Sequence, residues 1–289
     1  MGTLYVVATP IGNLGDVSKR TLEILETVDL IACEDTRQTI KLLNHYDIKK
    51  KMVAYHKFNE NSKSSTIIDD LLNGKNVALV SDAGTPCISD PGYILVNLAR
   101  KNNINVIGIP GPSATVTALS ISGLDTSNFS FLGFLSTDNK KFKEEMEKIK
   151  KSSFNTFVIY ESPKRLIKLV EKLKEYFKGS NIFIASDLTK IHERSFFGLI
   201  EDVYELIVND PKIEKGEYVV ILEKKDCFDE EVLVQQISIE AMLIDKMVKE
   251  KCSLKDAIKF INNEEKGLKK NQIYDASLNL KKILESLCK

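Results

Sequence analysis

The sequence predicts an α/β protein with two α/β domains and a small helical C-terminal appendage. Up to Leu124, short apolar runs alternate with Gly/Pro loops and helical segments, which is the pattern of a parallel sheet with crossover helices. Beyond Leu124, strand-like runs outnumber helical ones, as in a mixed sheet. From Glu230 onward no strand-like run occurs. We therefore expect domains over residues 1–124 and 125–228 and a helical appendage over 229–289.

In the first domain, the expected strands are the runs LYVVA, VALV and VIGI at residues 4–8, 77–80 and 106–109. Each run is followed by a loop that contains Gly or Pro and then by a helix-like segment. Ligands bind to such sheets beyond the carboxyl ends of the strands. Any ligand site is therefore expected in these three loops.

In the second domain, strands are expected at runs rich in aromatic and β-branched residues, with helices only at about 139–151 and 163–178 between them. These runs are residues 129–134, 156–160, 181–186, 195–199 and 217–223. In the appendage, the apolar spacing predicts short helices at about 231–250, 253–263 and 269–287.

The composition is that of a globular protein without a net charge. Of the 289 residues, 43% are hydrophobic and 28% charged, which excludes a disordered or fibrous protein. The 41 Lys and Arg balance the 41 Asp and Glu, so an anionic partner needs a local basic patch. Residues 139–178 hold twelve Lys and Arg against six Asp and Glu. This excess fits an RNA-binding surface, and it equally fits a solvated helix face.

The cysteines, the histidines and the N-terminus indicate a cytoplasmic protein. Its five cysteines are odd in number and far apart, without a C-x-x-C pair, and its three histidines share no metal-ligand spacing. We therefore expect neither a disulfide framework nor a metal site. The N-terminus lacks the basic segment of a signal peptide, and no apolar run approaches the ~18 residues of a membrane span. We expect no signal peptide and no membrane contact.

The loops after the first and third expected strands carry weak ligand signals. Residues 8–16 hold two glycines but neither a Walker lysine nor a G-x-G-x-x-G spacing. This loop is either a phosphate cradle or a tight turn in which Asp16 or Ser18 caps the next helix. In residues 109–115, Ser113 either caps a helix of small residues or presents helix N–H groups to a ligand such as a carboxylate.

The loop after the second expected strand is the strongest ligand signal. Its sequence SDAGTPCISDPG, residues 81–92, holds two Asp, two Pro and two Gly directly after an apolar run. Asp90 before Pro91 fits a helix N-cap followed by a first-turn proline, which is a structural role. Asp82 has no such role, so it is the expected ligand contact.

Seven motifs follow one another along the chain, and together they resemble the tetrapyrrole-methylase-like superfamily of S-adenosylmethionine (SAM) methyltransferases. They are LYVVATPIGNLGD (4–16), ACEDTR (32–37), VSDAGTPCISDPG (80–92), IPGPSA (109–114), YESPKR (160–165), LTKIHE (188–193) and GEYVVILE (216–223). Two positions depart from the pattern of the superfamily. Ser136 stands where Pro usually follows GFL, and Ser186-Asp187 stands where Arg-Glu usually precedes LTK, which removes a basic side chain and shortens a carboxylate.

The resemblance implies two α/β domains with SAM in the cleft between them, and a homodimer. Carried over residue by residue, it implies SAM contacts from both domains. The residues are Pro10, Ser81, Asp82, Ala83, Ser113, Ala114, and Tyr160 or Glu161.

Within the superfamily, the motifs are most similar to those of members that methylate the 2′-hydroxyl of a cytidine ribose in the decoding region of 16S ribosomal RNA. The implied partner is this RNA, either free or in the assembled small ribosomal subunit. A group that takes the hydroxyl proton is then needed. The candidates, among which the sequence does not choose, are Glu34, Asp35, Glu161, Lys190 and Glu193. The expected phosphate contacts are Arg37, Lys164, Arg165 and Lys190.

Two other functions remain as alternatives. One is SAM-dependent methylation of a small molecule such as a tetrapyrrole, which does not need the ACEDTR and YESPKR clusters or the basic segment. The other is a non-catalytic RNA-binding assembly factor, which would have no affinity for SAM.

Overall fold

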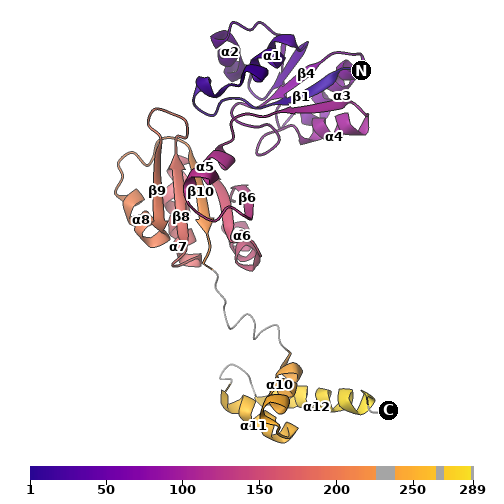
Figure 1. The fold of residues 1–289 in the computed structure, drawn as a ribbon, viewed down its shortest axis with the longest axis vertical. Coiled ribbons are helices and arrows are strands. Elements are labelled where there is room, and N and C mark those ends of the chain that lie inside the picture. The colour runs from indigo at the N-terminus through magenta and orange to yellow at the C-terminus, as the bar shows by residue number, and fades with distance from the viewer. Residues whose placement is uncertain (226–237, 265–269, 288–289) are drawn as a thin grey trace. The chain divides into compact units, whose positions relative to one another are not determined.

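A computed structural model describes residues 1–225, 238–264 and 270–287 (Figure 1). The chain separates into two compact units, residues 1–225 and 226–289. Both sheets lie in the first unit. The domain limits at 124 and 228 stay predictions, and residue 228 lies outside the described residues.

The first sheet is entirely parallel, as predicted, with the strand order β3-β2-β4-β1-β5. Its strands are β1 (Thr3–Val7), β2 (Leu30–Cys33), β3 (Met52–Ala54), β4 (Val77–Val80) and β5 (Asn105–Ile109). The predicted runs correspond to β1, β4 and β5. In β4, Val77 and Leu79 face one core and Ala78 and Val80 face another, which explains a continuous apolar run.

Strands β2 and β3 were not predicted. Both are short, with four and three residues, and neither is followed by a Gly/Pro loop like those after β1, β4 and β5. They extend the sheet beyond β4, and the ACEDTR motif begins with the last two residues of β2 and continues past the end of this strand.

The segments between these strands are mainly helical. They are the 3-10 turn η1 (Leu14–Asp16) and the helices α1 (Lys19–Thr27), α2 (Thr36–His45), α3 (Glu60–Leu72), α4 (Tyr93–Lys101) and α5 (Ala114–Ser122). Ser18, rather than Asp16, caps α1 by accepting a hydrogen bond from the Thr21 amide. Ser113 caps α5 in the same way through the Val116 amide. The predicted N-cap role of Asp90 is wrong, because the N-cap of α4 is Gly92, whose amide donates to Glu60 Oε1.

The second sheet is mixed, as predicted, with the order β6-β7-β10-β8-β9. Its strands are β6 (Phe129–Phe134), β7 (Thr156–Glu161), β8 (Asn181–Ser186), β9 (Arg194–Leu199) and β10 (Tyr218–Glu223). β6 and β7 are parallel, and the other pairs are antiparallel.

Three helices accompany this sheet: α6 (Asn139–Lys151), α7 (Pro163–Tyr176) and α8 (Ile200–Val208). The expectation of only two helices here is wrong. α8 begins directly after the last residue of β9, with no turn between them, and it is rich in the β-branched residues that are typical of strands. Its buried residues Ile200, Val203 and Ile207 nevertheless follow a helical spacing.

Helix α5 joins the two halves of the first unit (Figure 1). It follows β5 of the first sheet, yet Ala118 and Leu119 are buried in a core with residues of the second sheet such as Val158 and Val219. The opposite face of the second sheet forms a separate core that includes buried residues of α6, α7 and α8. The packing of α5 therefore links the loop at residues 110–113 to the second sheet.

The second unit contains α10 (Ile239–Glu250), α11 (Leu254–Glu264) and α12 (Lys270–Leu287). These helices share a small core of Leu243, Ala257, Ile261, Ile273, Ala276 and Leu280. Part of the expected helix 231–250 lies outside the described residues, and the described part begins at Ile239 after the N-cap Ser238. In the described ranges, no helix combines the length and hydropathy that a membrane span requires.

A substitution at Ala118 tests the packing of α5. Ala118 is fully buried between α5 and the second sheet, so Ala118→Leu should lower the free energy of unfolding by about 1–3 kcal/mol through overpacking. Ser120→Leu, on the exposed side of the same helix, should change it by less than about 0.5 kcal/mol. Urea unfolding measures both, and equal effects would contradict the close packing.

Candidate functional site

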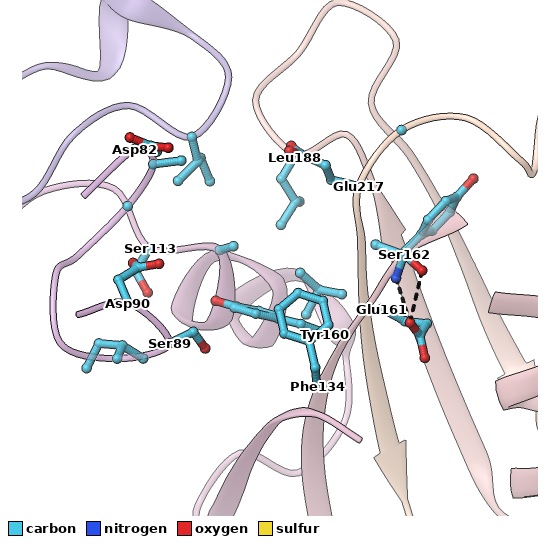
Figure 2. A pocket seen from close by; sticks show the side chains of 18 of the residues that line it. Asp82, Ser89, Asp90, Ser113, Phe134, Tyr160, Glu161, Ser162, Leu188 and Glu217 are labelled. Atoms are coloured by element: carbon cyan, nitrogen blue, oxygen red, sulfur yellow. Dashed lines mark hydrogen bonds between the residues drawn. The ribbon is translucent and has the colours of Figure 1, made fainter. Parts of the chain in front are cut away.

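A pocket of about 420 Å³ lies among loops of both sheets (Figure 2). Residues 82–85 and 88–90, after β4, contribute to its lining from the first sheet. Residues 160–163, at the end of β7, and 216–219, at the start of β10, contribute from the second. The pocket therefore lies where the resemblance implies a cleft. It is beyond the carboxyl end of β4 in the first sheet and beyond that of β7 in the second.

Most of the residues expected to contact SAM line this pocket. They are Asp82, Ala83, Ser113, Ala114, Tyr160 and Glu161. Pro10 and Ser81 do not line it, whereas Ile11 does. Ser81 is buried beneath the loop, where its hydroxyl donates to the carbonyl of Gly84 at 3.1 Å. Its place indicates that it shapes the loop.

Hydrogen bonds that involve the backbone hold three of these loops together. The amides of Thr9 and Gly84 each donate to the other residue's carbonyl, at 2.9 and 3.0 Å. The hydroxyl of Thr85 donates to the carbonyl of Pro112 at 3.2 Å. The loops after β1, β4 and β5 thus form one connected edge, with the small residues Ala83, Gly84 and Ala114 along the pocket.

Three carboxyl groups at this edge resist ionisation. Burial raises the pKa of Glu34, of Asp82 and of Asp90, and repulsion from neighbouring carboxylates adds to each increase. Asp82 also accepts a hydrogen bond from the Asp35 amide at 3.0 Å, which favours its charged form. A cationic ligand at this edge would relieve the repulsion.

Asp35 and Arg37 bind each other. Asp35 is the N-cap of α2 and accepts from the Arg37 amide at 2.8 Å. The guanidinium of Arg37 donates to both carboxylate oxygens, and these hydrogen bonds lower the pKa of Asp35 to about 2. Neither residue lines the pocket. A carboxylate with so low a pKa is a weak base, which disfavours Asp35 as the group that takes the hydroxyl proton.

Glu161 is buried at the pocket wall and pairs with the half-buried Arg165. The Glu161 side chain is 1% exposed, and Arg165 Nη2 lies 3.0 Å from its Oε2. The other oxygen, Oε1, accepts from the Ser162 amide and hydroxyl (Figure 2). Arg165 also donates to the Leu135 carbonyl at 2.9 Å. Both candidate residues therefore have partners inside the protein.

Lys190 lies between Asp187 and Glu217, at 2.8 and 2.9 Å from their carboxylates. Burial tends to lower its pKa, but the hydrogen bonds to the two carboxylates outweigh burial and raise it. Lys190 therefore stays protonated near neutral pH. A Cβ on Gly12 would lie 2.7 Å from Lys190 Cγ, so the loop after β1 passes directly against this lysine.

Glu34, Lys190 and the two remaining candidates do not line the pocket. Glu193 accepts from the Thr189 amide at 2.6 Å within its own loop. Lys164 is exposed in the first turn of α7. Ser136 and Ser186, which depart from the superfamily pattern, also lie outside the lining, and Ser186 is fully buried.

Several lining residues were not predicted as site residues. They include Ile88, Ser89, Asp90, Phe134, Ser162 and Leu188. Ser89 and Asp90 belong to the SDAGTPCISDPG loop, so the composition of that loop could have indicated them. Nothing in the strand-like run FSFLGF indicates that Phe134 reaches the pocket.

Comparisons with known proteins agree with this arrangement. The family model of Tetrapyrrole (Corrin/Porphyrin) Methylases matches residues 3–204. The "Ribosomal RNA small subunit methyltransferase I" of Halalkalibacterium halodurans is 42% identical over 278 residues, which are 95% of this chain and 94% of that protein.

Two solved structures show the same fold. The methyltransferase CobJ is 15% identical with a TM-score of 0.57, over 78% of this chain and 95% of CobJ. A uroporphyrin-III C-methyltransferase from Thermus thermophilus, complexed with S-adenyl homocysteine, is 13% identical with a TM-score of 0.52, over 76% of this chain and 97% of that one.

An NMR titration tests the coupling of the three carboxyl groups. Asp82→Asn removes a negative neighbour that raises the pKa of both Glu34 and Asp90, so both pKa values should fall. A raised carboxyl pKa means that the folded chain binds the proton more tightly than the unfolded chain. The raised pKa values therefore lower the free energy of unfolding at neutral pH. This penalty is lost as the pH falls through the folded pKa values toward the unfolded ones. Asp69→Asn on the exposed side of α3 is the control, and unchanged pKa values in Asp82→Asn would contradict the coupling.

Unfolding experiments separate the two arginine pairs. Arg165→Met leaves the buried Glu161 carboxylate without a cation and should lower the free energy of unfolding by about 1–3 kcal/mol, less than for a fully buried pair because Arg165 is 37% exposed. Glu161→Gln added to Arg165→Met should restore part of this loss. Arg37→Met breaks an exposed pair and should leave stability nearly unchanged. A similar loss in Arg37→Met and Arg165→Met would show that burial does not distinguish the pairs.

Proposed function

The chain belongs to the tetrapyrrole (corrin/porphyrin) methylase family, and from this premise we propose that it transfers the methyl group of SAM to the 2′-hydroxyl of a cytidine ribose in 16S ribosomal RNA. The RNA substrate is supported by relatives named ribosomal RNA small subunit methyltransferase I, at 42% and 40% identity. The observation that carries the proposal is the pocket, which six of the residues expected to contact SAM line from both sheets.

The residues of the pocket fit SAM. SAM supplies an electrophilic methyl group on a positively charged sulfonium. Asp82 and Asp90, whose pKa values are raised by burial and by neighbouring carboxylates, suit a cation. Ala83, Gly84 and Ala114 leave the backbone open to close approach by a bulky ligand. Asp82, Ala83, Ser113 and Ala114 would hold it from the first sheet, and Tyr160 from the second.

Transfer to a ribose hydroxyl requires orientation, exclusion of water and a proton acceptor. Glu34 is the candidate whose carboxyl has no hydrogen-bond or ion-pair partner in the described part of the chain, and its pKa is raised. Glu34 does not itself line the pocket, but its carboxyl interacts with those of Asp82 and Asp90, which do. This position, together with a pKa that favours proton binding, leads us to assign proton acceptance to Glu34. Lys190 stays protonated, but the carboxylates of Asp187 and Glu217 offset its charge, so it is less suited to attract the RNA backbone than the exposed Lys164.

The basic segment supports an RNA partner. On α6, Lys140, Lys141, Lys143 and Lys151 are exposed. On α7, Lys164 and Lys168 are exposed. These helices pack on one face of the second sheet, so their lysines offer a local cationic surface on a chain with no net charge. A homodimer in the cytoplasm and action on the assembled subunit remain predictions from the resemblance.

A substrate without the acceptor oxygen tests the reaction. With labelled SAM, the protein should methylate 16S ribosomal RNA, supplied either free or in small ribosomal subunits. The same RNA with a single 2′-deoxycytidine at the methylated position should bind comparably and accept no label, because the nucleophile is missing.

The other outcomes identify the alternatives. Label on the base of the deoxy substrate, recovered after nucleoside digestion, would rule out ribose methylation. Calorimetric titration with SAM is the second measurement, and a protein that binds the RNA but not SAM would be an assembly factor.

A further inference from the structure

Phe134, the last residue of β6, lies in the pocket wall with its side chain largely open to solvent. It is 60% exposed and lines the pocket, and Figure 2 shows its ring beside that of Tyr160. An exposed aromatic ring inside a pocket is costly in water and is characteristic of a binding surface.

An irregularity in β6 gives Phe134 this position. Residues three apart on a regular strand point to opposite faces. Between β6 and β7 the register shifts, because Phe131 pairs with Val158 whereas Gly133 pairs with Ile159. Leu132 is thus an extra residue, and Gly133 has a φ of 65°, which side chains with a Cβ rarely adopt. The bulge brings Phe131 and Phe134 to the same side of the strand.

The ring of Phe134 rests on a fixed support. The rings of Phe131 and Phe134 make edge contacts with Tyr160, at centroid distances of 5.0 and 5.8 Å. The hydroxyl of Tyr160 is 2.8 Å from Thr115 Oγ1 on α5. The loop that contains Ser89 lies next to the end of β6, since a Cβ on Gly133 would be 3.7 Å from Ser89 Oγ. The wall is therefore held from both sheets.

We propose that Phe134 is the stacking surface for the base of the nucleotide that accepts the methyl group, an inference that rests on the proposed function. A ribose that enters the pocket brings its base with it, and proteins bind unstacked bases on aromatic rings. The loops expected to hold SAM after β4 and β5 belong to the first sheet, whereas Phe134 ends an edge strand of the second. Lys140, Lys141 and Lys143 follow it at the start of α6, exposed and suited to neighbouring phosphates.

Kinetics of three variants test this role. Phe134→Leu keeps an apolar side chain but removes the ring face, so the KM for ribosomal RNA should rise about tenfold. The Kd for SAM and the midpoint of thermal unfolding should stay the same. Phe134→Tyr keeps the ring and should keep the wild-type KM. Phe129→Leu is the matched control, because Phe129 is 40% exposed at the other end of the same strand.

A substrate that lacks one base makes the test specific. In RNA with an abasic nucleotide at the position that the wild-type protein methylates, Phe134→Leu should cause no further rise in KM. Additive losses in this double-mutant cycle would overturn the inference. An unchanged KM in Phe134→Leu, or a parallel change in the Kd for SAM, would overturn it as well. Failure of the wild-type protein to methylate ribosomal RNA would instead overturn the proposed function, and the inference with it.

Discussion

Helix α5 serves both halves of the first unit. Its N-cap, Ser113, and its first residue, Ala114, line the pocket beside the loops of the first sheet. Further along, Ala118 and Leu119 are buried against the second sheet, and Thr115 contacts the hydroxyl of Tyr160. Because one rigid helix makes all of these contacts, the distance between the two walls of the pocket depends on how α5 packs. The hydrogen bonds of Thr9, Gly84 and Thr85 connect the loops after β1 and β4 to the loop before α5, so the positions of these loops also depend on how α5 packs.

Charge is distributed locally, although the chain as a whole is neutral. Carboxyl groups that resist ionisation gather at the edge of the first sheet, at Glu34, Asp82 and Asp90. Exposed lysines gather on α6 and α7 at the second sheet. In the proposed reaction these regions face substrates of opposite charge, a cationic methyl donor and an anionic RNA. Such a separation would favour a cation at the edge of the first sheet, where it relieves the repulsion among the carboxyl groups, and RNA phosphates on the face that carries α6 and α7.

Much of the fold could be predicted from the sequence, because apolar runs followed by Gly/Pro loops, such as 77–80, have few other interpretations. β2 and β3 were missed because they are short and no such loop follows them, and α8 because its β-branched residues resemble those of a strand. Asp82, Ser113 and Tyr160, which line the pocket, could be named from the sequence because each belongs to a motif of a few consecutive residues. The burial of Glu161 and the position of Phe134 were not predicted. The first depends on how the chain packs and the second on a change of strand register, and tertiary packing decides both.

The hydrogen bonds between Thr9 and Gly84 join main-chain atoms only. Such bonds tolerate a change of side chain as long as the backbone path is kept. The edge of the first sheet can therefore keep its shape while neighbouring side chains vary in evolution. The wall at Phe134 depends instead on the bulge in β6 and on side chains, because the rings of Phe131 and Phe134 rest on Tyr160. A protein engineer could exchange the β6–α6 segment while keeping Tyr160 as its support, and so redirect the enzyme toward a new acceptor without changing the loops proposed to bind SAM.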